Sequence, residues 1–141
     1  MDDEKRHEQG MRIRRAVLGE DHVRRAQAGA DDFNADFQDL ITRYAWGEIW
    51  TRPGLPRHTR SLLTIVMMVA TNREEELKLH LRAAANNGVT RDEIKEALLQ
   101  TAIYCGVPAA NGAFRLAQEV FDAADAQSAA NETHGEAKRD A

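Results

Sequence analysis

The residues best suited to acid–base chemistry lie along one predicted helix. Glu76 and His80 are four residues apart, and Arg73 precedes Glu76 by one turn. Side chains at this spacing share one edge of a helix. A carboxylate beside an imidazole orients the ring and raises its pKa, which would make His80 a proton donor near neutral pH. The same spacing also occurs on ordinary helix surfaces, where a charge pair contributes only roughly 0.2–0.5 kcal/mol.

A metal ion is the other chemistry that Glu76 and His80 could support. Two ligands four residues apart can share a metal, but a metal site needs at least three protein ligands. None of the remaining histidines has a ligand-like spacing, and we expect a site without a metal. His7 and His22 are predicted to be surface residues of the first helices. The histidines without ligand-like spacing are His7, His22, His58 and His134.

A second candidate set lies in the stretch AWGEIWTRPGLPRHTRSL, residues 45–62, which connects two predicted helices. The chain is acidic overall, yet the only acid of this stretch is Glu48. Guanidinium groups suit bidentate capture of carboxylates, and a helix N-terminus also attracts anions. The cluster favours a site for a small anion, whereas each cation alone could be solvated or paired with Glu48. The cations are Arg52, Arg57, His58 and Arg60.

Both tryptophans of the chain lie in the same stretch. Trp46 and Trp50 are four residues apart, so a helix places them on one face. Large aromatic side chains of this kind can wall a binding pocket. They can equally anchor a core or a subunit interface, and the sequence leaves these alternatives open.

Composition limits the class of protein. The 141 residues suit a single domain, and a net charge of −4 argues against nucleic acid, whose phosphates need a broad basic surface. The apolar run at 62–70 is far short of the roughly 20 residues that cross a bilayer, so no membrane partner is expected. The polar first residues do not resemble a signal peptide, and one cysteine precludes an internal disulfide. We expect a soluble cytoplasmic protein.

Apolar periodicity predicts an all-α fold, a single-domain bundle of about six to seven helices. The first two helices are expected at 2–18 and 20–28, and Asp31 or Asp32 can cap the third. Thr59 is predicted to cap a helix that runs to Ala70. This helix is apolar nearly all round, so we expect it to be the buried central helix. Met67 and Met68 are expected to fill space in the core.

The second half of the chain carries the clearest local signals. A helix at 73–87 should end at Gly88 in a left-handed conformation. Thr90 and Glu93 form a predicted capping box for the next helix, on whose apolar face Cys105 should be buried. Pro108 suits the first turn of the last helix, whose buried side should carry residues such as Phe114. We assign 1–123 to the helical domain and 124–141 to a mobile polar tail.

Several long motifs together closely resemble the carboxymuconolactone decarboxylase family. They are GMRIRRAVLG, AWGEIWTRPGL, RSLLTI, ELKLHLRAAANNGVTRDEI and AIYCGVPAANGAF, and they span about Gly10 to Asp122. The resemblance implies an alkylhydroperoxidase-like helical fold, no cofactor, and assembly into rings, typically hexamers. It also implies a substrate that is a lactone with two carboxylates, which loses carbon dioxide in the protocatechuate branch of the beta-ketoadipate pathway.

The resemblance also implies roles for the candidate residues. The wider superfamily carries a Cys-x-x-Cys pair ahead of a histidine; His80 matches the histidine, while Arg73 and Glu76 stand in place of the cysteines. The lone Cys105 then argues against thiol-dependent peroxide chemistry. We expect His80 to deliver a proton and Glu76 to orient it. Trp46 and Trp50 would form walls, and the carboxylates and the lactone carbonyl would be held by Arg52, His58 and Arg60, with Arg73 as a further candidate.

Three alternatives remain open on the sequence. The chain could be a decarboxylase or isomerase for a related lactone, or a helical binding protein without catalysis. The connector could also meet His80 of a neighbouring subunit instead of its own, because the resemblance implies a ring.

Overall fold

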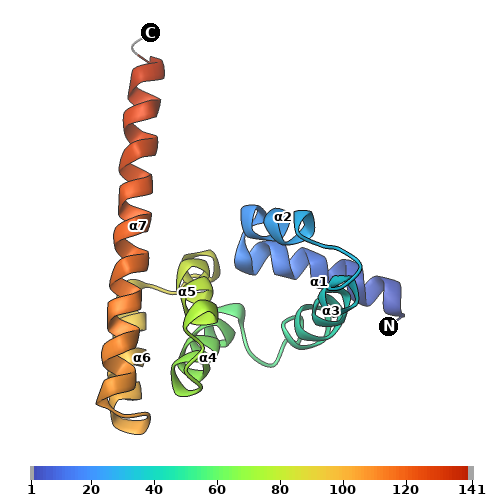
Figure 1. Cartoon of the computed structure of the whole chain (residues 1–141), viewed down its shortest axis with the longest axis horizontal. Coiled ribbons are helices and arrows are strands. Elements are labelled where there is room, and N and C mark those ends of the chain that lie inside the picture. Colours follow the sequence, from blue (N-terminus) through green and yellow to red (C-terminus); the bar gives the residue numbers. More distant parts are fainter. Residues whose placement is uncertain (1, 140–141) are drawn as a thin grey trace.

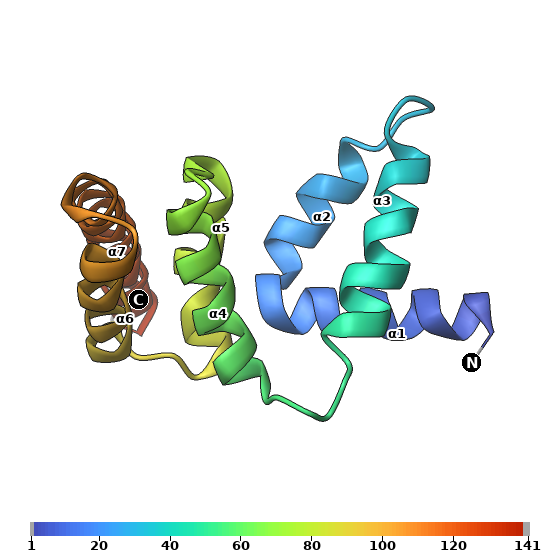
Figure 2. The same cartoon turned by 90° about the horizontal axis from the view of Figure 1, so that it is seen from below.

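The computed structural model describes residues 2–139 and confirms the predicted all-α fold. Within those residues the chain forms helices and connecting turns, without a strand. Figures 1 and 2 show α1–α3 gathered on one side and α4–α7 on the other. Along the described residues, none of the helices combines the length and the apolar character that crossing a membrane requires. The element bounds are α1 Asp3–Leu18, α2 Glu20–Ala28, α3 Ala35–Ile41, η1 Thr42–Ile49, α4 Arg57–Ala70, α5 Glu74–Ala83, η2 Ala84–Asn87, α6 Arg91–Tyr104 and α7 Val107–Arg139.

The first helices begin and end close to the predicted positions. Gly19 separates α1 from α2 with φ 93°, a conformation that favours glycine. Asp31 does not cap α3 directly; its side chain accepts hydrogen bonds from the backbone N–H groups of Phe33 and Asn34 in the preceding turn. α3 then continues into η1, a π-helix in which Trp50 N–H donates to the carbonyl of Ala45 at 3.0 Å.

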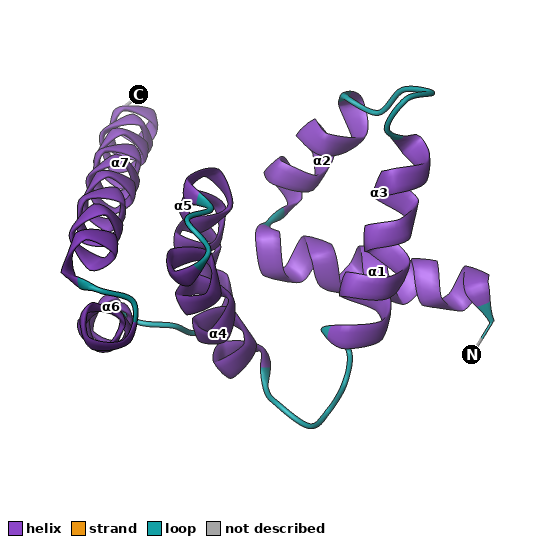
Figure 3. Ribbon diagram, turned by 60° about the horizontal axis from the view of Figure 1, so that its bottom comes forward, coloured by secondary structure: helices purple, strands orange, loops and turns teal. Residues whose placement is uncertain are grey.

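The connector ends in a helix that starts earlier than predicted. Figure 3 shows the connector as an open loop between η1 and α4. α4 begins at Arg57, with the extended Pro56 as its N-cap residue and no side-chain cap, so the prediction that Thr59 caps this helix was wrong. Pro56 fixes its own φ, and its carbonyl accepts the first helical hydrogen bond from Arg60 N–H at 3.1 Å.

The local signals of the second half are confirmed. Gly88 has φ 75° and ends η2 in the left-handed conformation. Thr90 and Glu93 form a complete capping box at the start of α6: Glu93 N–H donates to Thr90 Oγ1 at 3.1 Å, and Thr90 N–H donates to Glu93 Oε1 at 2.9 Å. Val89 and Ile94, which flank this box, are both buried in the same core cluster.

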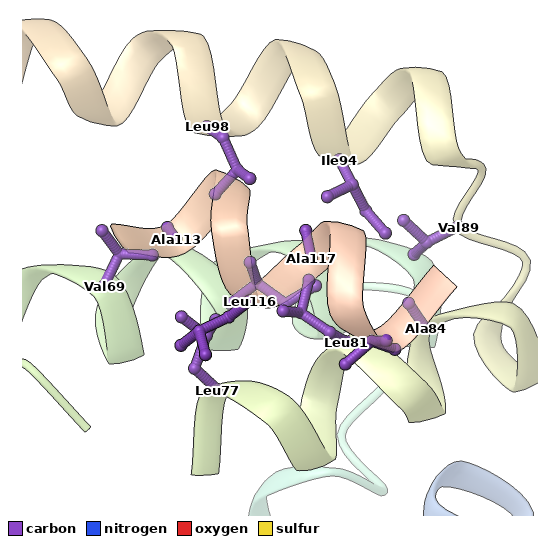
Figure 4. Packing of buried hydrophobic residues seen from close by; sticks show 12 residues of the cluster. Val69, Leu77, Leu81, Ala84, Val89, Ile94, Leu98, Ala113, Leu116 and Ala117 are labelled. Atoms are coloured by element: carbon purple, nitrogen blue, oxygen red, sulfur yellow. The ribbon is translucent and has the colours of Figure 1, made fainter. Parts of the chain in front are cut away.

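The main hydrophobic core joins α4, α5, α6 and α7, as Figure 4 shows. α4 contributes Ile65 and Val69 to it, but Met67 is 50% exposed. The prediction that α4 is a buried central helix therefore holds for one face only, and Met67 does not fill the core, whereas Met68 packs against it as predicted. Cys105, predicted to be buried, is also exposed. Phe114 is 36% exposed, so the expectation that it lies on the buried side of its helix fails as well.

α7 continues well past the predicted end of the domain. It runs as one helix to Arg139 and projects beyond the other helices in Figure 1. Beyond residue 123 its described side chains are mostly exposed, and Asp125 pairs with Arg91 at 2.7 Å. Helical structure here was not predicted; the mobility of 124–141 and the domain boundary at 123 stay predictions, and residues 140–141 lie outside the described part.

Candidate active site

His80 lies where two hydrophobic clusters meet on α5. Leu77 and Leu81 belong to the main core, whereas Leu79 and Ala83 belong to a second cluster with α1 and η1. His80 falls between these two faces of the helix and is half-buried. Its Nδ1 atom is fully buried and has no hydrogen-bond partner among the described residues. An unpartnered buried nitrogen of this kind is unusual and indicates a place where a ligand or water completes the structure.

The surroundings of His80 lower its pKa to about 4. Burial is the largest cause, because it disfavours the charged imidazolium, and the positive field of His22 adds to it. Glu76 acts in the opposite direction but does not outweigh them. Glu76 thus raises the pKa of His80 as expected, but the net shift is downward, so Glu76 alone does not keep His80 protonated near neutral pH. The imidazole is neutral at neutral pH until something negative is bound beside it.

Glu76 and Arg73 lie at the exposed start of the same helix. Arg73 is the N-cap residue of α5, and Glu76 is in its first turn. Both side chains are exposed, and along the described residues neither forms a hydrogen bond or ion pair with His80. Their proposed roles in orienting His80 and in binding an anion stay predictions.

The tryptophans do lie against the helix that carries His80. Trp46 is buried and Trp50 half-buried; their ring centroids are 5.1 Å apart and the planes are tilted by 34°. Both belong to the cluster that contains Leu79 and Ala83 of α5. The π-helical turn of η1 brings the two rings together on this side. Of the predicted alternatives, the structure shows the core position, and the role of the two rings as pocket walls stays a prediction.

His58 and Arg60 of the connector have partners other than His80. His58 Nε2 lies 2.6 Å from Oε2 of Glu93, so it ties the start of α4 to the start of α6. Arg60 donates to the carbonyl of Arg52 at 3.2 Å, and Arg52 itself is exposed. Within the described chain none of these three forms a hydrogen bond or ion pair with His80. Their substrate-binding roles stay predictions, including the version in which they serve a neighbouring subunit.

Two cationic residues of the N-terminal helices were missed by the sequence reasoning. Arg14 is only 5% exposed and donates to Gln38 Oε1 at 2.9 Å and to Thr42 Oγ1 at 3.3 Å. His22, predicted to be a surface residue, is half-buried; its pKa is lowered by burial and then by Arg14 and neighbouring arginines. Arg14 could have been found, because it shares helical spacing with the buried Gly10 and Val17.

Comparison with known proteins gives the family. The model of the carboxymuconolactone decarboxylase family matches residues 35–119, which is more than half of the chain. The chain belongs to the carboxymuconolactone decarboxylase family. The resemblance predicted from the motifs is thereby confirmed. The matched range contains Trp46, Trp50 and His80, whereas Arg14 and His22 lie outside it.

Two relatives with specific names are similar to this chain over most of its length. A 4-carboxymuconolactone decarboxylase of Acinetobacter baylyi is 57% identical over 121 residues, which cover 86% of this chain and 90% of that protein. A nitrosuccinic acid decarboxylase of Metarhizium robertsii is 44% identical over 115 residues, covering 82% of this chain and 80% of that protein. Both relatives are named as decarboxylases. Among the described residues no group of three or more potential ligands is arranged to hold a metal ion.

Proposed function

We propose that the protein removes carbon dioxide from 4-carboxymuconolactone to give 3-oxoadipate enol-lactone, a step of the protocatechuate branch of the beta-ketoadipate pathway. The observation that carries this proposal is the 57% identity to a protein of that name across 90% of its length. The family assignment and the half-buried histidine of α5 agree with it. A second candidate, decarboxylation of a related acid, is supported by the relative named for nitrosuccinic acid.

The substrate can supply its own electron sink, and we therefore propose that no cofactor takes part. The bond between the ring carbon and the leaving carboxylate breaks, and its electron pair moves through the ring double bond into the lactone carbonyl. The resulting dienolate takes one proton on the ring carbon next to that carbonyl, which yields the enol-lactone. The protein has to hold the remaining carboxylate, exclude water from the leaving one and place a proton donor.

His80 is the proposed proton donor, with Glu76 orienting it. The imidazole is neutral in the free chain because burial lowers its pKa to about 4. A dianionic ligand beside it reverses the sign of the local field and raises that pKa, so His80 gains its proton as the substrate binds. The apolar face made by Trp46 and Trp50 favours loss of charge from a carboxylate placed against it.

The reaction itself can be tested with freshly generated 4-carboxymuconolactone and the purified, full-length protein. A chelator is present throughout, evolved carbon dioxide is counted, and the product is identified. We expect one carbon dioxide per lactone and formation of the enol-lactone. An unchanged lactone would contradict the proposed reaction, and turnover of nitrosuccinic acid alone would move the function to the second candidate.

We also propose that the protein acts in the cytoplasm as a homo-oligomer. The family resemblance suggests that this oligomer is a hexamer. Its surface supports association: the turn before α3, α3 itself and the start of η1 carry a stripe of exposed apolar side chains at helical spacing, including Phe33 at 96% exposure. An open groove of about 790 Å³ lies between α4 and α6, with Leu63, Val66 and Met67 on one wall. The stripe consists of Phe33, Phe37, Leu40 and Tyr44.

Phe37→Glu is expected to weaken the assembly, because it places a charge in the middle of this stripe. Light scattering coupled to size-exclusion chromatography should show a smaller molar mass than for the wild-type protein at equal concentration. Asp36→Asn is the matched control, since Asp36 is exposed next to the stripe and should leave the mass unchanged. A wild-type mass for Phe37→Glu would contradict a subunit contact at this stripe.

Removal of the residues after Ala126 is expected to leave turnover intact. The shortened chain keeps the Arg91–Asp125 ion pair, and the described side chains that it loses are largely exposed. The measurement is kcat and KM of the 1–126 chain beside the full chain. A large loss of turnover would show that this end of α7 covers the site or joins subunits.

A further inference from the structure

A small pocket opens between the α1–α2 turn and α5, the helix that carries His80. Its volume is about 300 Å³, and it is lined by residues 18–22 of the turn, by Arg25, and by Leu79 and Arg82 of α5. Leu79 directly precedes His80 in the sequence, and Arg82 follows it by two residues. The pocket therefore shares its supporting helix with the candidate proton donor.

The cations of this pocket have no anionic partner. Neither Arg25 nor Arg82 forms an ion pair or a side-chain hydrogen bond within residues 2–139. The two acids at its rim are paired elsewhere, Glu20 with Arg15 at 3.5 Å and Asp21 with Arg24 at 3.6 Å. Two guanidinium groups and the imidazole of His22 thus line the hollow together with Glu20 and Asp21, whose charges are paired with arginines outside it.

The cations of this region act on the pKa of His22 in the same direction as burial. Burial lowers that pKa, and the positive charges of Arg14, Arg25 and Arg82 lower it further. Arg14 does not line the pocket; it is a buried cation whose Nε atom has no partner in the described chain. The positive field of His22 reaches His80 in turn. A carboxylate in the pocket would relieve this repulsion at both histidines at once.

We propose that this pocket binds the carboxylate that the substrate keeps, the one on its acetate arm, with Arg82 and Arg25 as anchors and His22 as a further contact. The inference rests on the proposed function. A guanidinium group holds a carboxylate through two parallel hydrogen bonds, so Arg82 fixes the orientation of the arm as well as its position. The lactone ring then lies toward His80, and the leaving carboxylate lies away from these cations. This assignment gives Arg82 of α5, with Arg25 and His22 of α2, the role that the connector cations were expected to fill.

Arg82→Gln tests this assignment by steady-state kinetics on 4-carboxymuconolactone. Loss of a charge-assisted contact should raise KM about 10- to 100-fold, with a much smaller change in kcat. Arg82→Lys, which keeps the charge but not the fork, should recover part of the affinity. The matched control is Arg115→Gln, an exposed arginine on α7, which should leave KM unchanged. An unchanged KM in Arg82→Gln with normal wild-type turnover would overturn the inference and leave the proposed function standing.

A binding measurement separates the pocket from the reaction. Isothermal titration calorimetry with glutarate, a saturated dicarboxylate that cannot react, is carried out on the wild-type protein and on Arg82→Gln. Weaker binding to Arg82→Gln supports the pocket even if the lactone is not turned over. Equal binding to both proteins, or none to the wild type, overturns it.

Discussion

His80→Ala is expected to lower kcat about 100- to 10,000-fold, the usual contribution of a positioned proton donor. The variant should still fold, because His80 is only half-buried and its Nδ1 makes no hydrogen bond within the described chain. Stopped-time assays of carbon dioxide release give kcat, and circular dichroism confirms the helical fold. His134→Ala, on the exposed end of α7, is the control and should keep wild-type turnover. Near-normal turnover of His80→Ala would assign the proton to another group, such as His22, His58 or a water.

The same variant has a second readout in the pH dependence of stability. The pKa of His80 is about 4 in the folded chain and near 6.5 when unfolded. Between these values the unfolded chain binds more protons than the folded one, so this histidine makes stability rise with pH. Its contribution is fully present above pH 6.5 and is lost as the pH falls toward 4. Denaturant unfolding from pH 4 to 7 should therefore be flatter for His80→Ala than for the wild-type protein.

Gly10→Ala is expected to destabilise the fold by about 1–3 kcal/mol, the usual cost of overpacking. α1 crosses η1 at Gly10, where an added Cβ would overlap the carbonyl oxygen of Thr42 and lie 2.9 Å from the nitrogen of Gly47. A Cβ added at Gly47 would likewise overlap the carbonyl oxygen of Arg6. Because this crossing supports the cluster of Trp46 and Leu79, a shift here also displaces the wall beside His80.

A loss of stability in Gly10→Ala would indicate a steric clash, because alanine by itself stabilises a helix relative to glycine by about 1 kcal/mol. The matched control is Gly112→Ala in α7, where an added Cβ would meet nothing within 4 Å. That variant should be neutral or slightly more stable. Urea unfolding of the two variants gives the comparison. Equal stability of Gly10→Ala and Gly112→Ala would contradict a close α1–η1 crossing.

The features predicted correctly are those that neighbouring residues determine. The capping box of Thr90 and Glu93 and the left-handed Gly88 depend on backbone groups a few residues away. The start of α4 was misplaced because two cap signals compete there, and the rigid Pro56 prevails over Thr59. The continuation of α3 into the π-helix η1 follows from packing against α1, which local patterns do not encode.

The candidate site was only partly predictable, for electrostatic reasons. The spacing of Glu76 and His80 was visible, but the pKa of His80 is governed by burial and by His22, which lies 58 positions earlier in the chain. In the sequence Arg14 looks like an ordinary polar residue of the first helix, whereas in the structure its side chain is buried. Apolar periodicity likewise identified the faces of Met67 and Cys105 but not whether the chain itself covers them.

We propose that loss of carbon dioxide is followed by proton delivery from a fixed group, His80 on α5. Turnover of 4-carboxymuconolactone in heavy water, with rapid quenching and analysis of the product by nuclear magnetic resonance, tests it most directly. We predict one deuterium on the ring carbon next to the lactone carbonyl, and on one face of that carbon only. Equal labelling of both faces would contradict a positioned donor, and recovery of unreacted lactone would contradict the decarboxylation itself.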